Sequence, residues 1–237
     1  MLHNAGPSRT GIGDLRCVVF DFDGTLVVSN AIKQETFYST VKDIPGAEAC
    51  LNDILARPQR GDRTDIFRAL DRLLRDRRLY SGGEPERWVR VYSETCERVI
   101  IRAPEVPGAV RVLGALLDKG IACYVNSSTP TVALERIVEG RGWARYFSKC
   151  LGWTGDKAGN LRTIAHESYT PQDMVMVGDS QDDLDAATAF GCSFVGIGSD
   201  SSRFLRAPDT LLPDLNVLAD RLFAPASGSL AATPSNP

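Results

Sequence analysis

The sequence predicts an α/β fold: a doubly wound, Rossmann-like parallel sheet with an all-helical cap inserted after its first strand. Two observations predict the sheet. Short apolar runs recur along the chain, and amphipathic helical patterns separate them. Strands buried on both faces of a parallel sheet have this apolar character. Their alternation with helices is typical of doubly wound domains. The third observation predicts the cap, since no strand-like run occurs between about residues 28 and 104.

Each element of the predicted core follows from one local pattern. The apolar runs that predict strands are residues 15–20, 121–125, 149–153, 174–177 and 193–197. The helical patterns between them are residues 109–119, 130–139, 157–167 and 184–190. Pro130 suits the first turn of its helix, and Thr129 is the expected N-cap residue.

The cap is predicted from apolar side chains at helical spacing. Residues 62–80 and 85–101 each place such side chains on one face, among them Trp88 and Tyr92, which we interpret as packing residues. The predicted organisation is therefore a core and a cap between two polar or Pro-rich tails. The core comprises residues 14–27 and 106–223, the cap residues 28–105, and the tails residues 1–13 and 224–237.

Composition excludes several classes of protein. The 237 residues carry 27 Lys+Arg and 30 Asp+Glu, a net charge of −3, which argues against a nucleic-acid partner. No run approaches the about 18–20 apolar residues of a membrane span. The N-terminus lacks the apolar region of a secretory signal, and the six cysteines form no C-x-x-C pair. These features predict a cytoplasmic protein with reduced thiols and no membrane partner, and they leave the oligomeric state open.

Reactive side chains follow the predicted strands. Asp21 and Asp23 follow the first strand, Ser127 follows the second and Asp179 follows the fourth. Lys157 comes a few residues after the third. Ligands of open α/β sheets bind beyond the carboxyl ends of the strands, so we expect these residues to meet at one edge of the sheet.

The residue types at this edge favour phosphoryl chemistry. Asp21 and Asp23 are two residues apart, so in an extended segment their side chains point the same way. With Asp179 they form three mutually repelling carboxylates, which a hard cation such as Mg²⁺ would stabilise. One carboxylate can attack phosphorus. Another can protonate the leaving oxygen and later activate water. A lysine, a serine hydroxyl and backbone amides can neutralise the phosphoryl group.

The motifs resemble those of the haloacid dehalogenase-like hydrolases. DFDGTL at residues 21–26 resembles the first motif, and Ser127 resembles the hydroxyl residue of the second. Lys157, in GDKAGNL, resembles the third-motif lysine, and GDSQDD at residues 178–183 resembles the fourth. The helical insert resembles the cap of the phosphoglycolate-phosphatase and β-phosphoglucomutase branch. The resemblance extends from about residue 15 to residue 200.

This resemblance implies a Mg²⁺-dependent phosphatase that hydrolyses a small-molecule phosphomonoester through an aspartyl-phosphate. It implies that Asp21 is the nucleophile and Asp23 the general acid and base. The implied metal site comprises four aspartates, of which Asp23 contributes its backbone carbonyl and Asp183 orients metal-bound water or Lys157. The four are Asp21, Asp23, Asp179 and Asp183.

The remaining implied roles concern substrate binding. Ser127 and Lys157 hold the phosphoryl oxygens, and the backbone amide of Ser128 assists them. In the cap, Arg60 and Arg63 lie at a position that resembles the substrate-reading loop of this branch, where a guanidinium suits a second carboxylate or phosphate.

Several residues depart from the family pattern or have a second interpretation. Lys157 is followed by Ala158 where this branch often has proline, which leaves Lys149 as a competing third-motif lysine. Asn126 stands where an apolar residue is more usual. Lys33, early in the first cap helix, has two interpretations, the cleft and a solvated helix face, of which the solvated face is favoured.

Other functions of the same fold remain open. A phosphomutase keeps all four motifs, whereas a non-catalytic binding protein would be expected to have lost one of the motif aspartates. Asp23 argues against a dehalogenase, and the cap has no suitably placed lysine for a phosphonatase.

Overall fold

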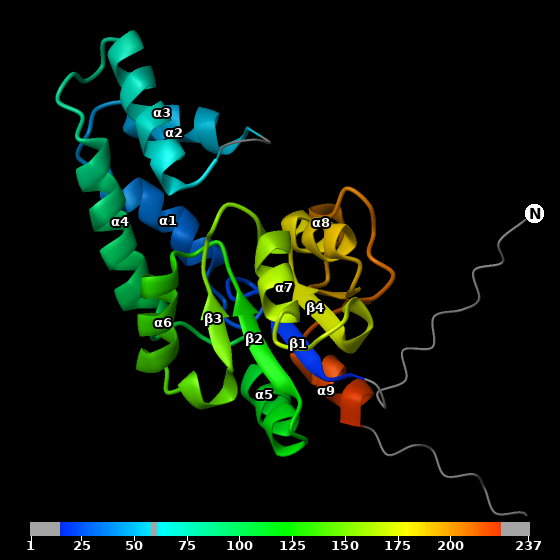
Figure 1. Cartoon of the computed structure of the whole chain (residues 1–237). Coiled ribbons are helices and arrows are strands. Elements are labelled where there is room, and N and C mark those ends of the chain that lie inside the picture. The colour runs from blue at the N-terminus through cyan, green and yellow to red at the C-terminus, as the bar shows by residue number, and fades with distance from the viewer. Residues whose placement is uncertain (1–14, 58–60, 224–237) are drawn as a thin grey trace, which may run out of the picture.

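The computed structural model describes residues 15–57 and 61–223, so the two predicted tails and Arg60 lie outside the described residues. Six strands form one parallel sheet in the order β3-β2-β1-β4-β5-β6, which confirms the predicted α/β class (Figure 1). The strands are β1 (Cys17–Phe20), β2 (Ala122–Asn126), β3 (Lys149–Leu151), β4 (Met174–Gly178), β5 (Ser193–Ile197) and β6 (Leu211–Leu212).

The core helices follow the strands in sequence. They are α5 (Ala109–Asp118), α6 (Thr131–Gly140), α7 (Lys157–Ala165), α8 (Gln181–Phe190) and α9 (Leu215–Phe223), with short 3-10 turns at Ala144–Tyr146, Pro171–Asp173 and Ser201–Arg203. Neither β6 nor α9 is predicted from the sequence. β6 is too short to give an apolar run, whereas the buried Leu215, Leu218 and Ala219 of α9 do recur at helical spacing.

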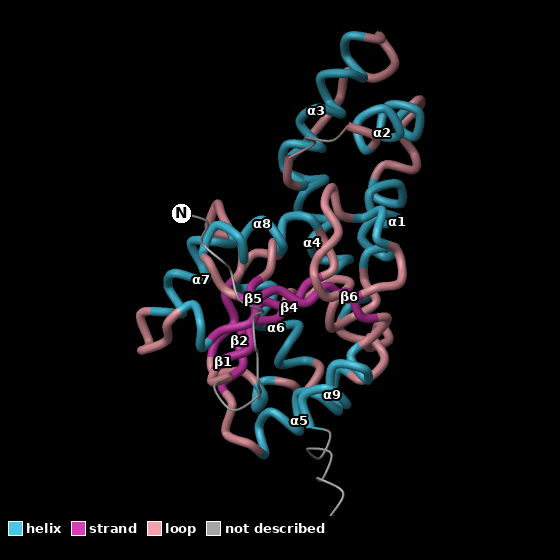
Figure 2. The backbone as a smooth tube through the Cα atoms, turned by 90° about the vertical axis from the view of Figure 1, so that its right-hand side faces the viewer, coloured by secondary structure: helices cyan, strands magenta, loops and turns pink. Residues whose placement is uncertain are grey.

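The sheet is covered on both faces, as its apolar strands require. Val18 and Phe20 belong to one buried cluster, together with side chains of α5, α6 and α9. Cys17 and Val19 belong to a second cluster with α7 and α8. Figure 2 shows the sheet between these two layers of helices. Alternate residues of β1 therefore enter opposite layers.

Strand β1 lies at the point where the sheet reverses its order. It pairs with β2 on one side and with β4 on the other. From β2 the chain continues outward to β3, and from β4 it continues to β5 and β6. The carboxyl ends of β1, β2 and β4 thus meet at a topological switch point, where doubly wound folds bind their ligands.

The helical cap lies between β1 and α5 in the chain. It comprises α1 (Asn30–Thr40), α2 (Ala47–Leu55), α3 (Arg63–Asp76) and α4 (Pro85–Ile100). Four rings pack at its centre, those of Phe37, Phe67, Trp88 and Tyr92, and four pairs of them have ring centroids between 4.3 and 6.1 Å apart. Trp88 and Tyr92 are buried, which confirms that they are packing residues.

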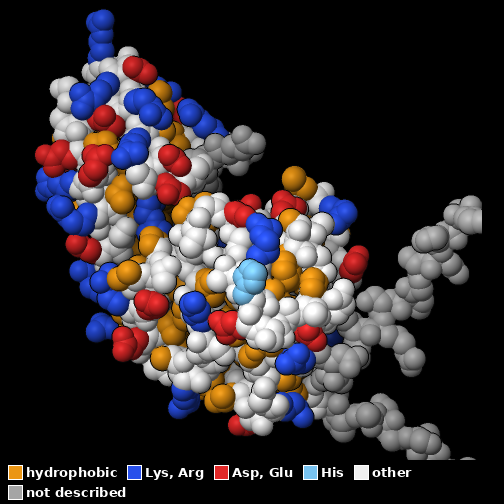
Figure 3. Space-filling model, in the orientation of Figure 1, with side chains coloured by type: hydrophobic (Ala, Val, Ile, Leu, Met, Phe, Trp, Pro, Cys, Tyr) orange, Lys and Arg blue, Asp and Glu red, His pale blue; other side chains and the backbone are white. Residues whose placement is uncertain are grey.

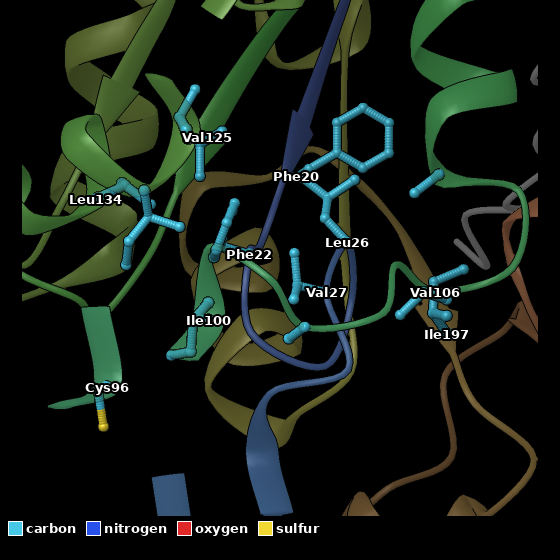
Figure 4. Close-up of a cluster of buried hydrophobic side chains, with 14 of the residues drawn as sticks. Phe20, Phe22, Leu26, Val27, Cys96, Ile100, Val106, Val125, Leu134 and Ile197 are labelled. Atoms are coloured by element: carbon cyan, nitrogen blue, oxygen red, sulfur yellow. The ribbon is translucent and has the colours of Figure 1, made fainter. Parts of the chain in front are cut away.

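The long helix α4 connects the cap to the core. Its Cys96 and Ile100 belong to the same buried cluster as Leu134 of α6 (Figure 4). Arg136 of α6 also pairs with Glu97 of α4 at 2.8 Å. The cap and the sheet therefore share a continuous apolar core.

The surface shows no dominant charge on the face in view. Figure 3 shows basic and acidic side chains interspersed over the cap, consistent with the near balance of charge in the sequence. Within the part of the chain that the structure describes, no helix has both the length and the apolar character needed to cross a membrane.

Candidate active site

The loop after β1 presents Asp21 and Asp23 to the same side. Phe22 between them is fully buried in the apolar cluster, near Ile100 and Leu134 (Figure 4). Because neighbouring side chains of an extended segment alternate in direction, burial of Phe22 turns both aspartates toward the carboxyl edge of the sheet. This is the arrangement expected from their spacing.

Asp21 is held from the core by Lys157. The Lys157 ammonium donates to Asp21 Oδ1 at 2.6 Å and to Asp183 Oδ1 at 2.6 Å. All three side chains are at most 7% exposed. Burial alone would lower the pKa of Lys157, but the charges of Asp21 and Asp183 outweigh it and raise the pKa. Lys157 is therefore a permanent buried cation between two carboxylates.

The carboxyl group of Asp21 lies in a site that disfavours a further negative charge. Its burial raises its pKa to about 8, against the opposing effect of Lys157. The carboxylates of Asp183, Asp179 and Asp23 contribute to this rise. A second cation beside Asp21 would relieve this repulsion and favour the ionised form.

Asp183 is positioned by the start of α8. Its Oδ2 accepts hydrogen bonds from the backbone N–H of Ser180 at 3.1 Å and from the Ser180 hydroxyl at 2.6 Å. This is a capping box, in which the N-cap residue and the third helical residue satisfy each other. The opposite oxygen is thereby aimed at Lys157.

Asp23 is held from the cap and from the loop after β2. It accepts hydrogen bonds from Ser29 Oγ at 2.7 Å, Thr129 Oγ1 at 3.0 Å and Lys33 Nζ at 2.5 Å. Ser127 Oγ lies 3.5 Å from its Oδ2. Burial tends to raise the pKa of Asp23, but Lys33 and the hydrogen bonds from Lys33, Ser29 and Thr129 lower it below its ordinary value.

Two of these contacts correct expectations from the sequence. Lys33 is not on a solvated face, because α1 begins at Asn30, beside the site, and its first turn faces Asp23. Thr129 is not an N-cap residue, because α6 begins at Thr131 with Pro130 in the N-cap position. The Thr129 hydroxyl instead accepts a hydrogen bond from Lys33 at 2.9 Å and donates to Asp23.

Asp179, after β4, completes the acidic part of the site. Its carboxylate accepts hydrogen bonds from Asn30 Nδ2 at 2.9 Å and from the Arg203 guanidinium. Burial raises its pKa, and Arg203 opposes the rise. Gly24 has a φ of +87°, and a Cβ at this position would lie 2.3 Å from Asp179 Oδ2. Only glycine therefore allows the first loop to approach Asp179 this closely. Asn30 and Arg203 were not found from the sequence, where they stand outside any recognisable motif.

Asp21, Asp179 and Asp183 form what we call the carboxylate cluster. One oxygen of each lies within 4.8 Å of the others, and all three residues are buried. Together with Asp23 they present four carboxylates, which three basic side chains contact: Lys33, Lys157 and Arg203. A buried group of hard oxygen donors with an excess of negative charge fits Mg²⁺.

The other predicted site residues of the core differ in burial and in their position on the sheet. Ser127 is buried, and its Oγ accepts a hydrogen bond from the backbone N–H of Thr129 at 3.1 Å. Ser128, the next residue, is exposed. Lys149 is exposed at the start of β3, the end of the strand away from the site, so the structure brings Lys157 and not Lys149 to Asp21.

Arg63 of the cap contacts α4 and not the carboxylates. Its Nη1 donates to Ser93 Oγ at 3.3 Å, and its guanidinium lies 5.9 Å from the centre of the Tyr92 ring. Burial raises the pKa of Tyr92, Arg63 opposes this rise and Asp23 adds to it. The Tyr92 phenol is therefore within electrostatic range of both Arg63 and the site.

Comparison with known proteins agrees with the fold and the motifs. The family model of the haloacid dehalogenase-like hydrolases matches residues 15–191. A phosphoglycolate phosphatase from Shigella boydii is 30% identical over 250 residues, which cover 90% of this chain and 95% of the relative.

Solved structures share the architecture. A predicted phosphoglycolate phosphatase from Haemophilus somnus matches with a TM-score of 0.69 at 21% identity, over 90% of this chain and 98% of its own. YfnB from Bacillus subtilis, whose structure is bound to magnesium, matches with a TM-score of 0.67 at 13% identity, over 88% of this chain and 98% of its own. With a family match that spans most of its length, the chain belongs to the haloacid dehalogenase-like hydrolases.

Proposed function

We propose that the protein hydrolyses a small-molecule phosphomonoester through an aspartyl-phosphate on Asp21. One observation carries the proposal: two carboxylates from one loop face the same site in different electrostatic settings. Asp21 lies among carboxylates and against Lys157, whereas Asp23 lies among hydroxyl donors and Lys33. Two acids with distinct surroundings suit a nucleophile and a separate acid–base group.

In the first step a carboxylate oxygen of Asp21 attacks phosphorus, and the bond from phosphorus to the ester oxygen breaks. Asp23 donates its proton to that departing oxygen, which leaves as an alcohol. Ser127 and Lys157 hold the phosphoryl oxygens, and the backbone amide of Ser128 assists. The Lys157 charge stabilises the transition state because it is already fixed in a buried site.

In the second step Asp23, now a carboxylate, takes a proton from a water molecule that attacks phosphorus. The bond between Asp21 and phosphorus breaks, which releases phosphate and returns Asp21 as a carboxylate. Asp23 is protonated again and ready for the next substrate. The same residue thus serves as acid and then as base.

The carboxylate cluster would hold Mg²⁺, with Asp21, Asp179 and the backbone carbonyl of Asp23 as ligands. Both oxygens of Asp183 already accept hydrogen bonds from Ser180 and Lys157, which favours a role beside the metal rather than on it. When bound, Mg²⁺ supplies positive charge that offsets the phosphoryl oxygens and the cluster. The magnesium in the YfnB structure supports this assignment.

The same residues and the relatives support a proposal for the substrate class. The site accepts one phosphoryl group, and the phosphoglycolate phosphatase relative makes 2-phosphoglycolate the first compound to test. That compound carries a carboxylate besides its phosphate. Arg63, on the cap and within electrostatic range of Tyr92, is the proposed partner of such a second charge.

The direct test is phosphate release from a panel of phosphorylated metabolites with Mg²⁺. We expect release from one or a few compounds, and we expect Asp21→Asn to abolish it. Asp220→Asn is the matched control, because Asp220 is exposed and pairs with Arg111 far from the site. Release by the Asp21→Asn protein at the rate of the wild type would overturn the nucleophile assignment.

Two additions to this assay separate the alternatives. Excess chelator should stop turnover, and full activity in its presence would contradict the metal site. A phosphomutase would convert a sugar phosphate to its isomer and would depend on a bisphosphate activator. If the activity depends on such an activator and releases little phosphate, the protein is a phosphomutase and not a phosphatase.

A further inference from the structure

Asn126, the last residue of β2, forms a buried hydrogen bond to the backbone of Lys157. It is fully buried, and its Nδ2 donates to the Lys157 carbonyl oxygen at 2.9 Å. The next residue in the chain is Ser127. One side chain therefore connects the strand that carries Ser127 to the helix turn that carries Lys157.

Asn160 of α7 extends this contact. Its Nδ2 donates to Asn126 Oδ1 at 2.9 Å and to the Gly152 carbonyl oxygen at 3.0 Å. Its Oδ1 accepts a hydrogen bond from the Thr154 hydroxyl at 2.8 Å. Asn160 is 3% exposed. The two amides thus tie the end of β2, the loop after β3 and the first turn of α7 into one network.

The orientation of both amides is determined by their partners. The carbonyl oxygens of Lys157 and Gly152 can only accept hydrogen bonds, so each must face an amide nitrogen. Asn160 Nδ2 uses both of its hydrogens, on the Gly152 carbonyl oxygen and on Asn126 Oδ1, so only the oxygen of Asn160 is left, and it accepts from Thr154. A network in which every member has its partners rigidifies its surroundings.

We propose that Asn126 and Asn160 are positioning residues for the reaction, which fix the backbone of Lys157 relative to Ser127 and Asp21. A lysine side chain is long and flexible, so its ammonium is placed accurately only when both ends are held. Asp21 and Asp183 hold the ammonium end. Asn126 and Asn160 hold the backbone end. The inference rests on the proposed function for one point, the contact of Lys157 with the phosphoryl group.

The test uses variants that keep side-chain size but remove the hydrogen bonds: Asn126→Leu, Asn160→Leu and the double variant. Asn126→Asp is a second variant, which keeps the acceptor for Asn160 and replaces the amide donor to Lys157 with a carboxyl oxygen. Tyr124→Phe is the matched control. Tyr124 lies on the same strand, is 1% exposed and donates to Glu167 at 2.7 Å, beyond the far end of α7.

The first measurement is kcat and KM for p-nitrophenyl phosphate with Mg²⁺, below the unfolding temperature of each variant. We expect kcat to fall about 10- to 100-fold in Asn126→Leu and Asn126→Asp, because a small displacement of Lys157 weakens its contact in the transition state. The double variant should be no worse than Asn126→Leu, since both changes break one network. Tyr124→Phe should keep the kcat of the wild type.

The second measurement does not depend on turnover. The chain has five lysines, so the ¹³Cε signals of labelled lysine can be assigned with one variant each. We expect the Lys157 signal to move toward those of exposed lysines in the Asn126 variants and to stay in place in Tyr124→Phe. If the Asn126 variants lose only thermal stability, with kcat and the Lys157 signal as in the wild type, the inference is wrong. If the wild type itself shows no turnover that depends on Asp21, the proposed function fails, and the Lys157 signal alone decides the inference.

Discussion

Two lysines contact the aspartates of the first loop, and they come from different parts of the molecule. Lys157 belongs to the core helix α7 and pairs with Asp21, and its side chain is 7% exposed. Lys33 belongs to the cap helix α1 and pairs with Asp23, and its side chain is 23% exposed. Asp21 is therefore held entirely by the core, whereas part of the setting of Asp23 belongs to the cap.

This difference separates the two chemical roles. The groups that hold the proposed nucleophile belong to the core and not to the cap. Lys157, which pairs with Asp21, lies on α7, and Asp183, which pairs with Lys157, lies on α8. The proposed acid–base group depends on the cap, since Lys33 lowers the pKa of Asp23. Changes in the core should therefore affect the rate of the reaction, and changes at Lys33 should affect its pH dependence.

The largest effect is expected at Asp21. Asp21→Asn should lower kcat/KM by about 10⁴-fold or more, because an amide cannot form the phosphoryl intermediate. The fold should remain, since the change removes one negative charge from a crowded acidic site. Phosphate release measures the loss of activity, and circular dichroism measures the retention of the fold. If Asp21→Asn does not fold, the neighbouring Asp23→Asn is the second variant to test.

The next largest effect is expected at Lys157. Lys157→Met should lower kcat about 100- to 1,000-fold, the usual result of removing one fixed charge or donor from a transition state. It should also lower the free energy of unfolding by about 3 kcal/mol, because Asp21 and Asp183 stay buried without their cation.

A double variant separates these two effects of Lys157. Lys157→Met with Asp183→Asn should recover much of the lost stability but none of the lost activity. Thermal unfolding and phosphate release measure both. Recovery of activity in the double variant would show that Lys157 acts only through the fold.

A shift in pH dependence is expected at Lys33. Lys33→Met removes the cation that lowers the pKa of Asp23, so burial dominates and the pKa rises. Asp23 must be protonated to donate to the leaving oxygen, so the basic limb of the kcat/KM profile should move to higher pH. Lys42→Met, a change at an exposed lysine of the cap, is the control. A limb that stays in place or moves to lower pH contradicts the assignment of Asp23.

The same pair has a predicted sign in stability. The pKa of Asp23 is lowered below 3.8 on folding, so its contribution is present above pH 3.8 and is lost as the pH falls through the lowered value. Lys33→Met should therefore reduce stability at neutral pH and have little effect in strong acid. Urea unfolding at both pH values checks this.

The smallest effect is expected at Arg63. Arg63→Ala should raise KM about tenfold for a phosphate ester with a second negative charge, because one hydrogen bond to a charged group is lost. It should change KM little for p-nitrophenyl phosphate. Arg68→Ala, at an exposed arginine of the same helix that pairs with Glu86, is the control. Equal changes for both substrates would remove Arg63 from substrate recognition.

The residues that follow the core strands could be predicted from the sequence, and the partners of Asp23 could not. Asp21, Asp23, Ser127 and Asp179 each follow a buried strand, and parallel strands bring their carboxyl ends to one edge. That topology suffices to gather them. Lys33 and Thr129 meet Asp23 because of the path of two loops and the place where α1 begins, which no local pattern encodes.

For other residues the sequence indicated an unusual position but not the residue that it contacts. Asn126 is a polar residue at the buried end of a strand, which indicates a hydrogen-bonding partner, yet its partner Asn160 lies 34 residues further along the chain. Asn30, the first residue of α1, and Arg203, in a short 3-10 turn, contact Asp179 from two segments that the sequence alone does not bring together. Elements that are repetitive were predictable, and contacts between single residues of different loops were not.

The most direct test of the central claim is to trap the phosphoryl group on Asp21. Protein mixed with p-nitrophenyl phosphate and Mg²⁺ is quenched in acid, where acyl phosphates survive briefly, and its peptides are analysed by mass spectrometry. We predict that the mass of one phosphoryl group is added to the peptide that contains Asp21, that hydroxylamine removes it, and that Asp21→Asn lacks it. Phosphate release without any such adduct in rapid-quench samples, or an adduct that persists in Asp21→Asn, would contradict the account.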